Sequence, residues 1–278
     1  MKTDNKITVL KRLIPALTFA LLIIFSLAGC SKKNNTPVVS KTFVLVHGSF
    51  QGPYAWQYVK AQLEQAGQKV VVVELPGHGH DQTPPATLTL NSYRDKVITV
   101  IDSLQGQVVL VGHSLGGAVI TAVADSIPNR IERLVYLAGF VPANGQSVID
   151  LNAMDPNSQL TPALMPSADH TTASVADSLI LPIFCQDGNA TVNQLLIANN
   201  RPEPAAPLYS PIVLKNPAMA NVPKYYIHTT QDRAITITLQ NQMVAAAGIK
   251  NIYTINSSHS PHLSMPGQVT AILLQIVK

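Results

Sequence analysis

The segment GHSLG at residues 112–116 places a serine between two glycines, directly after the apolar strand predicted for residues 108–111. A G-x-S-x-G segment at a strand-to-helix turn is typical of a nucleophile, because the glycines allow the tight turn that exposes the hydroxyl. The start of the following helix favours the negative charge that develops during attack on a carbonyl. We therefore predict Ser114 as a nucleophile; the alternative is a glycine-rich turn with an incidental serine.

A serine hydroxyl needs a base within hydrogen-bond reach before it becomes a nucleophile. In proteins with this motif the acid and then the histidine follow the serine along the chain. Two of the later histidines are poorly placed, since His170 falls in a proline-rich region and His228 inside a predicted strand. His259 lies in a loop after the last predicted strand, so we predict it as the base, with His262 as its competitor.

A carboxylate must fix the tautomer of that histidine and stabilise its charged form. Asp232 follows the strand predicted at residues 224–229, and it is the only side-chain carboxylate after Pro204. We predict Asp232 as the acid of the site. Asp187 and Glu203, from the proline-rich region, are its competitors. The alternative role for Asp232 is the N-cap of the helix that follows.

The negative charge on an attacked carbonyl oxygen requires two preorganised N–H donors. We predict the backbone N–H of Leu115, directly after the serine, as one of them. The other comes from the loop HGSF at residues 47–50, after the first predicted strand, where we predict the Ser49 N–H, with Phe50 as the alternative. A turn that simply reverses the chain there is a compatible interpretation.

Two histidines and an acid gather in the segment PGHGHD at residues 76–81, a composition that suggests a metal site. No further ligand set at metal spacing is evident, and the Gly and Pro content indicates a loop. We therefore predict no metal and no cofactor. Cys185 follows two apolar residues, which favours a small buried side chain over a nucleophile.

Short apolar strands alternate with helical stretches from residue 41 onward. The predicted strands are 42–46, 69–73, 108–111, 134–138, 224–229 and 251–255, and the predicted helices are 54–66, 91–104, 115–125, 235–247 and 267–277. The strands lack polar alternation, as expected when both faces of a sheet are buried. The pattern predicts an α/β fold, a mostly parallel sheet with helices on both faces.

The alternation lapses between about residues 140 and 220, a stretch that holds ten of the chain's 20 prolines. Proline at that density excludes long uninterrupted helices and central strands. We predict a cap inserted over the carboxyl edge of the sheet, with short helices near residues 172–180 and 191–198. Its apolar side chains either line a pocket or pack the cap to the core: Met154, Leu160, Leu164, Met165 and Phe184.

The first 30 residues have the composition of a targeting segment. A basic head precedes an apolar run over residues 13–28 and the sequence LAGC, which ends at Cys30. This pattern predicts a secretory signal peptide over residues 1–29, because the run is short for a membrane span; an uncleaved anchor helix is the alternative. LAGC resembles the lipobox of bacterial lipoproteins, which implies a lipidated Cys30 with a tether over residues 30–40. The body of the protein would then be held on a membrane of the bacterial cell envelope.

The basic balance of the chain belongs mostly to that leader. The sequence has 19 Lys and Arg against 15 Asp and Glu; residues 1–29 hold four of the bases and one of the acids, which leaves 15 against 14. No basic stripe with interleaved aromatic residues occurs, so we predict no nucleic-acid partner. Residues 41–278 suit one domain. With Cys30 lipidated, Cys185 has no disulfide partner.

Five segments resemble, in the same order, an α/β-hydrolase branch of plant methyl-ester esterases and hydroxynitrile lyases with bacterial relatives: FVLVHGSFQGPYAWQYV, ELPGHGHD, VGHSLGG, YYIHTTQD and SSHSPHLSMP. The resemblance runs from about residue 41 to the end and is weakest in the cap. It implies the α/β-hydrolase fold, a triad of Ser114, His259 and Asp232, and an oxyanion hole of the Ser49 and Leu115 N–H groups. The implied reaction is hydrolysis of a small to medium carboxylic ester through an acyl-enzyme.

Two positions depart from the lyases of that branch. Those lyases carry a threonine at the position of Gly48 and a lysine at the position of Ser260. Because this lysine helps to handle the cyanide leaving group, its absence disfavours lyase chemistry. A lyase that cleaves a C–C bond, and a ligand-binding protein that keeps the fold without catalysis, are the two alternatives to an esterase.

Overall fold

The computed structural model describes residues 40–278, which contain one six-stranded sheet of order β2-β1-β3-β4-β8-β9. Its strands are β1 (Thr42–Val46), β2 (Lys69–Val73), β3 (Val108–His113), β4 (Ile131–Leu137), β8 (Lys224–Thr229) and β9 (Asn251–Ile255). Every neighbouring pair in this sheet is parallel. The carboxyl ends of all six strands therefore lie along one edge, and the loops that follow them meet there.

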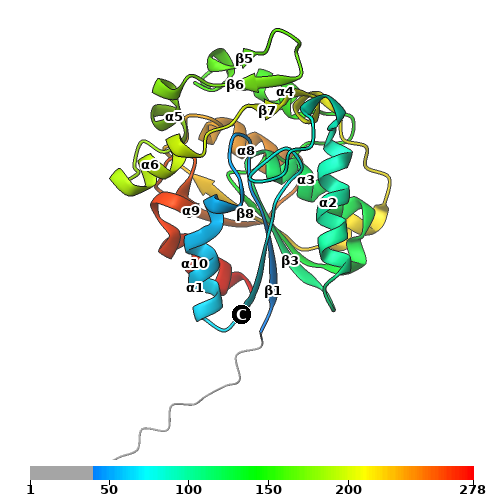
Figure 1. The fold of residues 1–278 in the computed structure, drawn as a ribbon. Helices are drawn as coiled ribbons and strands as arrows, with labels where there is room; N and C mark the ends of the chain where they lie inside the picture. Colours follow the sequence, from blue (N-terminus) through cyan, green and yellow to red (C-terminus); the bar gives the residue numbers. More distant parts are fainter. Residues whose placement is uncertain (1–39) are drawn as a thin grey trace, which may run out of the picture. The chain divides into compact units, whose positions relative to one another are not determined.

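Helices cover both faces of the sheet (Figure 1). They are α1 (Gln57–Gln65), α2 (Leu90–Asp102), α3 (Leu115–Ser126), α8 (Ile237–Ala246), α9 (Pro261–Ser264) and α10 (Pro266–Ile276). Alternate residues of a strand face opposite sides. In β1, Val44 packs into the cluster that holds α2, α3 and α8, whereas Phe43 packs into the cluster that holds α1 and α10. Burial on both faces explains the continuous apolar strand sequences.

The predicted fold class, a mostly parallel sheet with helices on both faces, is confirmed. Four predicted strands, 42–46, 69–73, 224–229 and 251–255, have the observed bounds. β4 begins three residues earlier than predicted, at Ile131. The early part of that strand holds Glu132 and Arg133, and because both are charged, this part lacks the apolar pattern that predicts a strand. The two side chains form an ion pair at 2.9 Å.

Short elements between β4 and β8 lie above the carboxyl ends of the strands in Figure 1. They are α4 (Val148–Ala153), β5 (Met165–Pro166), β6 (Thr172–Ser174), α5 (Asp177–Phe184), α6 (Ala190–Ala198), β7 (Glu203–Pro204) and α7 (Ala205–Tyr209). We call residues 138–223 the cap. Single 3-10 turns complete the chain at Pro53–Trp56, Pro85–Thr87, Pro128–Arg130, Thr161–Ala163 and Pro217–Asn221.

One predicted element of the cap is wrong. A helix was expected near residues 172–180, but residues 172–174 form strand β6 and α5 begins only at Asp177. β6 pairs with β5 on one side and β7 on the other in a small antiparallel sheet. Because β5 and β7 have two residues each, they carry no readable periodicity. The second predicted helix, near residues 191–198, matches α6.

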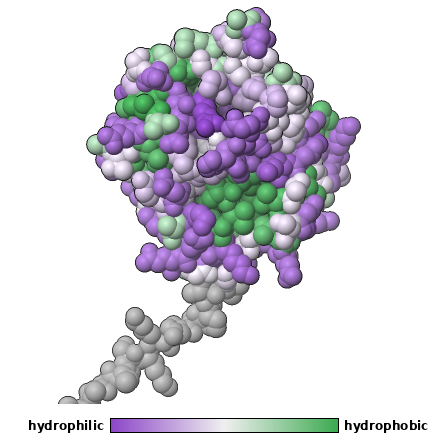
Figure 2. Space-filling view, viewed as in Figure 1, coloured by the Kyte–Doolittle hydropathy of each residue, from purple (hydrophilic) through white to green (hydrophobic). Residues whose placement is uncertain are grey.

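The edge strand β2 leaves part of its valine sequence exposed. Val70, Val71 and Val72 are half-buried, and Figure 2 shows an apolar area where β2 lies between α1 and α2, on a face that is otherwise mostly polar. Within residues 40–278, no helix combines the length and the apolar character needed to cross a membrane. The signal peptide predicted over residues 1–29, the lipidated Cys30 and most of the predicted tether lie outside the described residues.

Candidate active site

Ser114 occupies the turn between β3 and α3, in a backbone conformation that side chains rarely adopt, with φ 53° and ψ −124°. Its N–H donates to the Leu137 carbonyl at 3.3 Å, and its own carbonyl accepts from the N–H groups of Gly117 and Phe140. Such strain persists only where the surroundings enforce it, and it gathers at functional sites. The structure thus has the strand-to-helix turn that the sequence predicts around this serine.

Gly112 and Gly116, two residues before and after Ser114, allow the backbone of this turn to pack closely on itself and on the end of β1. A Cβ on Gly112 would lie 2.4 Å from the Gly116 carbonyl oxygen. A Cβ on Gly116 would lie 2.7 Å from the His47 carbonyl oxygen. These neighbours are backbone atoms, which do not move aside as the end of a flexible side chain does. The turn therefore depends on glycine at both positions.

Replacing Gly116 by alanine is expected to lower the free energy of unfolding by about 2–3 kcal/mol, because the added methyl group overpacks a rigid site. Gly267→Ala is the matched control: a Cβ there meets nothing within 4 Å, so we expect it to be neutral or slightly stabilising. Urea unfolding followed by circular dichroism measures both. Equal stability of the two variants would contradict the packing described here.

His259 and Asp232 are in contact and buried at the carboxyl edge of the sheet. His259 Nδ1 lies 2.7 Å from Asp232 Oδ2, which also accepts the Thr229 hydroxyl at 2.8 Å. An ionised carboxylate only accepts hydrogen bonds, so Nδ1 is the donor of this pair. The neutral ring therefore has its lone pair on Nε2, which is the atom that a base of this kind uses.

Asp232 does not cap a helix, so that alternative is wrong. α8 begins only at Ile237, and its N-cap residue Thr236 is held by Asp155 of the cap, through N–H and hydroxyl bonds of 2.8 and 2.7 Å. The second oxygen of Asp232 instead accepts the N–H groups of Ala234 and Ile235, both at 2.8 Å. These bonds shape the loop and fix the carboxylate beside the histidine.

The two competing acids bind other groups. Asp187 accepts the Ser258 N–H at 3.0 Å and also binds the Ser258 hydroxyl, so it holds the residue just before His259. Glu203 accepts from three donors of other loops, described below. Beside Asp187, burial raises the pKa of the Cys185 thiol to about 12, and the nearby carboxylate adds to the effect. This cysteine is a buried neutral side chain, as predicted.

The competing histidine, His262, lies buried beneath the site. Its ring centroid is 4.8 Å from that of Trp56 and 4.2 Å from that of His113. Burial lowers the pKa of His262 to about 3, so its ring is neutral near pH 7. His113 Nε2 donates to the His259 carbonyl at 2.9 Å. His262 therefore packs against the rings of Trp56 and His113. The hydrogen bond of His113 connects the loop of His259 to the end of β3.

The second N–H group predicted for the oxyanion hole, that of Ser49, lies in the loop after β1. The N–H of Phe50 donates to Glu203 at 3.1 Å, so the alternative donor of this loop already has a partner. Leu115 is the first residue of α3, where N–H groups have no partner within the helix. Ser49 and Leu115 thus keep the roles predicted for them as hypotheses.

The space above the loop after β1 is narrow. A cavity of about 10 Å³ is bordered by Ser49, Phe50, Gln51, Ile180, Phe184, Leu196 and Asn200. That volume holds about one water molecule, so an ester would need cap side chains to shift. Of the five apolar cap residues expected either to line a pocket or to pack the cap to the core, Phe184 borders this cavity. Met154 and Met165 are instead 48% and 47% exposed.

Glu203 of β7 forms a buried polar cluster that the sequence did not reveal. Its Oε2 accepts from the Phe50 N–H at 3.1 Å and contacts His78 Nε2 at 2.9 Å, and its Oε1 accepts the Tyr93 hydroxyl at 3.1 Å. His78 Nδ1 faces the Pro76 carbonyl at 3.1 Å, so both ring nitrogens face acceptors. Burial opposes a charge on this ring, but the carboxylate outweighs it and raises the pKa of His78.

This arrangement accounts for part of the segment at residues 76–81. His78 binds a cap carboxylate, and Asp81 accepts the N–H groups of Gly77 and Thr83 in a local turn. His80 is fully exposed. Within the described residues 40–278, no group of three His, Cys, Asp or Glu side chains is placed to hold a metal.

The stability of the protein should depend on the charge of His78. Because the folded pKa is raised, the ion pair contributes fully below the unfolded value of about 6.5, and the contribution is lost as pH rises through the folded pKa. Glu203→Gln should therefore destabilise the protein more at about pH 6 than at about pH 10. Urea unfolding between these two pH values measures the free energy of unfolding of the wild type and of Glu203→Gln. If this free energy depended on pH in the same way for both proteins, the result would contradict the ion pair.

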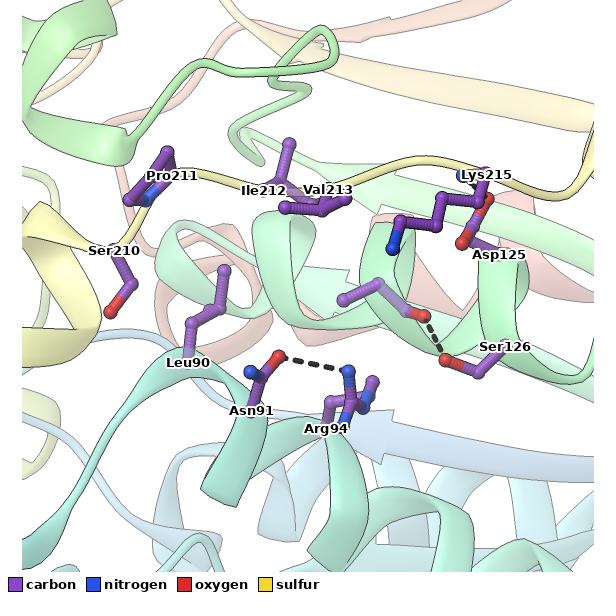
Figure 3. Close-up of a pocket in the computed structure, with 11 residues that line it drawn as sticks. Leu90, Asn91, Arg94, Asp125, Ser126, Ser210, Pro211, Ile212, Val213 and Lys215 are labelled. Carbon is purple, nitrogen blue, oxygen red and sulfur yellow. Dashed lines mark hydrogen bonds between the residues drawn. The ribbon is translucent and has the colours of Figure 1, made fainter.

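A separate pocket of about 350 Å³ lies between α2, the end of α3 and residues 210–215 (Figure 3). Arg94 on its wall donates to Asn91 at 2.8 Å, and Asp125 accepts the Lys215 N–H at 2.9 Å. None of the predicted catalytic side chains borders it. Cavity volume alone therefore does not locate the reactive groups of this protein.

The comparisons with known proteins agree with this fold. A family model described as "Alpha/beta hydrolase family" matches residues 43–272. Putative methylesterase 11, chloroplastic, of Arabidopsis thaliana is 30% identical over 249 residues, which cover 85% of this chain and 64% of that protein. Methylesterase 7 of the same plant is 29% identical over a match that covers 88% of this chain and 97% of that protein. This chain spans less than two thirds of the length of the first two curated relatives, at 64% and 56%.

Solved structures share the fold over most of this chain. Polyneuridine aldehyde esterase has a TM-score of 0.77 at 23% identity, with 86% of this chain and 100% of that chain covered. A pyrethroid hydrolase from Sphingobium faniae has a TM-score of 0.74 at 21% identity, with 85% and 97% covered. At these identities the likeness extends to the fold alone.

Proposed function

Because this chain belongs to the alpha/beta hydrolase family, we propose that it hydrolyses a carboxylic ester through a triad of Ser114, His259 and Asp232. The observation that carries the proposal is the 2.7 Å contact between His259 Nδ1 and Asp232 Oδ2, at the sheet edge where Ser114 sits in its strained turn. The esterase and methylesterase names of the similar proteins support an ester as the substrate.

The proposed reaction begins when Ser114 Oγ attacks the ester carbonyl carbon and His259 Nε2 takes its proton. The electron pair of the carbonyl moves to its oxygen, where the Ser49 and Leu115 N–H groups stabilise the charge. The tetrahedral adduct expels the alcohol, which receives the proton from His259. Water then attacks the acyl-enzyme with the same proton transfers and releases the acid. Asp232 orients the imidazole and stabilises its charged form throughout.

The space at Gly48 supports hydrolysis over the lyase alternative. A Cβ at this position would lie 2.6 Å from Ser114 Cβ, so the threonine of the resembling lyases does not fit without a shift of the backbone. Ser260 stands where those lyases carry a lysine. We propose an ester of small to medium size, such as a methyl, aryl or short acyl ester, and its entry beside Ser49 requires cap side chains to shift.

A screen of p-nitrophenyl and methyl esters with the full-length protein tests the proposed activity. We expect release of acid and alcohol from at least one ester class, with no added metal or cofactor. Release of an aldehyde or ketone in place of the acid would point to the lyase. Tight binding of a small molecule without turnover would point to a ligand-binding protein, and either result would contradict the proposal.

We also propose that residues 1–29 are a secretory signal and that Cys30 carries the lipid that holds the protein in a bacterial cell envelope. The basic head, the apolar run and the sequence LAGC support this proposal. In a bacterial host grown with an alkyne-tagged fatty acid, the wild type should be labelled and sediment with membranes. Cys30→Ser should lose the label, whereas Cys185→Ser should keep it. A label that survives Cys30→Ser would exclude this anchor.

A further inference from the structure

We propose that Glu203 of the cap is a positioning residue for the oxyanion hole, acting through the backbone N–H of Phe50. The inference rests on the proposed ester hydrolysis and adds a residue to it. Glu203 Oε2 accepts the Phe50 N–H at 3.1 Å, and Phe50 directly follows Ser49, whose N–H is the predicted oxyanion donor. The carboxylate lies 153 residues away in the chain and is fully buried.

Phe50 is held in a conformation that it would not adopt freely. Its φ is 62°, in the left-handed region that a bulky aromatic residue rarely occupies. A conformation of this kind survives only where surrounding contacts enforce it. Two contacts are present: the ring is buried 5.7 Å from that of Phe184, and the N–H is bound by Glu203. Both partners belong to the cap.

The peptide group that Glu203 binds shares a Cα atom with the oxyanion donor. The Phe50 N–H belongs to the peptide between Ser49 and Phe50, and the Ser49 N–H belongs to the preceding one. The two planes rotate about the Ser49 Cα, so fixing one limits the other. An oxyanion donor must be preorganised to stabilise the transition state. The Glu203 carboxylate therefore limits the directions in which the Ser49 N–H can point.

The carboxylate is itself fixed by the core of the protein. His78, in the loop after β2, and Tyr93 of α2 hold its two oxygens at 2.9 and 3.1 Å. The Glu203 backbone lies in β7, which pairs with β6 of the cap sheet. Glu203 thus joins the cap, two core segments and the loop of Ser49 in one buried cluster. A cap that moves away from the core would withdraw the acceptor from Phe50.

Two substitutions separate positioning from plain stability. Glu203→Ala removes the acceptor, and we expect kcat for a p-nitrophenyl ester to fall about 10- to 100-fold, with KM within about threefold, since the oxyanion exists only in the transition state. Glu203→Gln keeps one oxygen for the Phe50 N–H and loses the charge opposite His78. Its kcat should stay within about fivefold of the wild type although both variants are destabilised.

A trifluoromethyl ketone, which forms a tetrahedral adduct with a serine nucleophile, gives a second readout. Its inhibition constant for Glu203→Ala should rise in proportion to the fall in kcat/KM. Asp155→Asn is the matched control, because it changes another buried carboxylate of the cap, one that binds Thr236 and not the Phe50 N–H. We expect kcat of this variant within about threefold of the wild type.

If Glu203→Ala does not fold, the double variant Glu203→Met/His78→Leu replaces the buried pair by apolar side chains, which proteins often tolerate. It still lacks the acceptor, so the same loss of kcat is expected. Wild-type kcat in Glu203→Ala or in the double variant would overturn the inference, as would equal losses of kcat in Glu203→Ala and Glu203→Gln. Those results would overturn only the role of Glu203 and would not affect the proposed ester hydrolysis. A wild type that hydrolyses no ester would overturn both proposals.

Discussion

Replacing Ser114 by alanine is expected to lower kcat for ester hydrolysis by about 10⁴- to 10⁶-fold, because no acyl-enzyme can form without the hydroxyl. The side chain is small and nearly buried, so the fold and KM should change little. Initial rates with the best ester of the screen, in parallel with circular dichroism, measure both effects.

Ser126→Ala is the matched control for that substitution. Ser126 is the last residue of α3, the helix that begins directly after Ser114. Its hydroxyl donates to the Ala122 carbonyl at 2.9 Å, at the opposite end of this helix from the site. We expect it to keep wild-type kcat. Ester hydrolysis that persists in Ser114→Ala at more than about a hundredth of the wild-type rate would show that another group is the nucleophile.

Asp232→Asn is expected to lower kcat by about 10⁴-fold, with the fold retained. The amide nitrogen can donate to His259 Nδ1, which then becomes an acceptor and moves the ring proton to Nε2. A protonated Nε2 cannot take the proton of Ser114. Steady-state rates near neutral pH measure the loss.

Asp155→Asn provides the comparison for Asp232→Asn. Asp155 is also a buried carboxylate, and it holds Thr236 at the start of α8 through two hydrogen bonds. Its loss should lower the melting temperature, and kcat at a temperature well below unfolding should stay within about threefold of the wild type. Equal losses of kcat in the two variants would mean that Asp232 acts through stability and not through the histidine.

Local patterns made most of the sheet predictable. Parallel strands buried on both faces appear as continuous apolar sequences, so the bounds of β1 follow directly from the sequence. The turn at Ser114 is equally local, because five consecutive residues determine it. The histidine and the acid follow from chain order and from their positions after strands, which place them at one edge of a parallel sheet.

The cap was less predictable because long-range pairing creates its structure. β6 forms only against residues 165–166 and 203–204, and no periodicity in the sequence distinguishes it from a helix. The start of α8 was placed too early for a similar reason. Asp155, far along the chain, supplies its N-terminal hydrogen bonds, while the local carboxylate Asp232 is occupied with the histidine.

The cluster around Glu203 had no signal in the sequence. Its four members, Phe50, His78, Tyr93 and Glu203, come from separate segments, and each type of residue is common in loops or helices. The histidine-rich segment at residues 76–81 was predicted as a loop, and in the structure His78 of this loop contacts the cap carboxylate of Glu203.

Labelling with a fluorophosphonate, followed by peptide mapping, tests most directly whether Ser114 is the activated nucleophile. We expect one equivalent of label on the peptide that contains Ser114, strongly reduced labelling in Asp232→Asn, and none in Ser114→Ala. A label that persists in Ser114→Ala, or that maps to another residue of the wild type, would contradict the account.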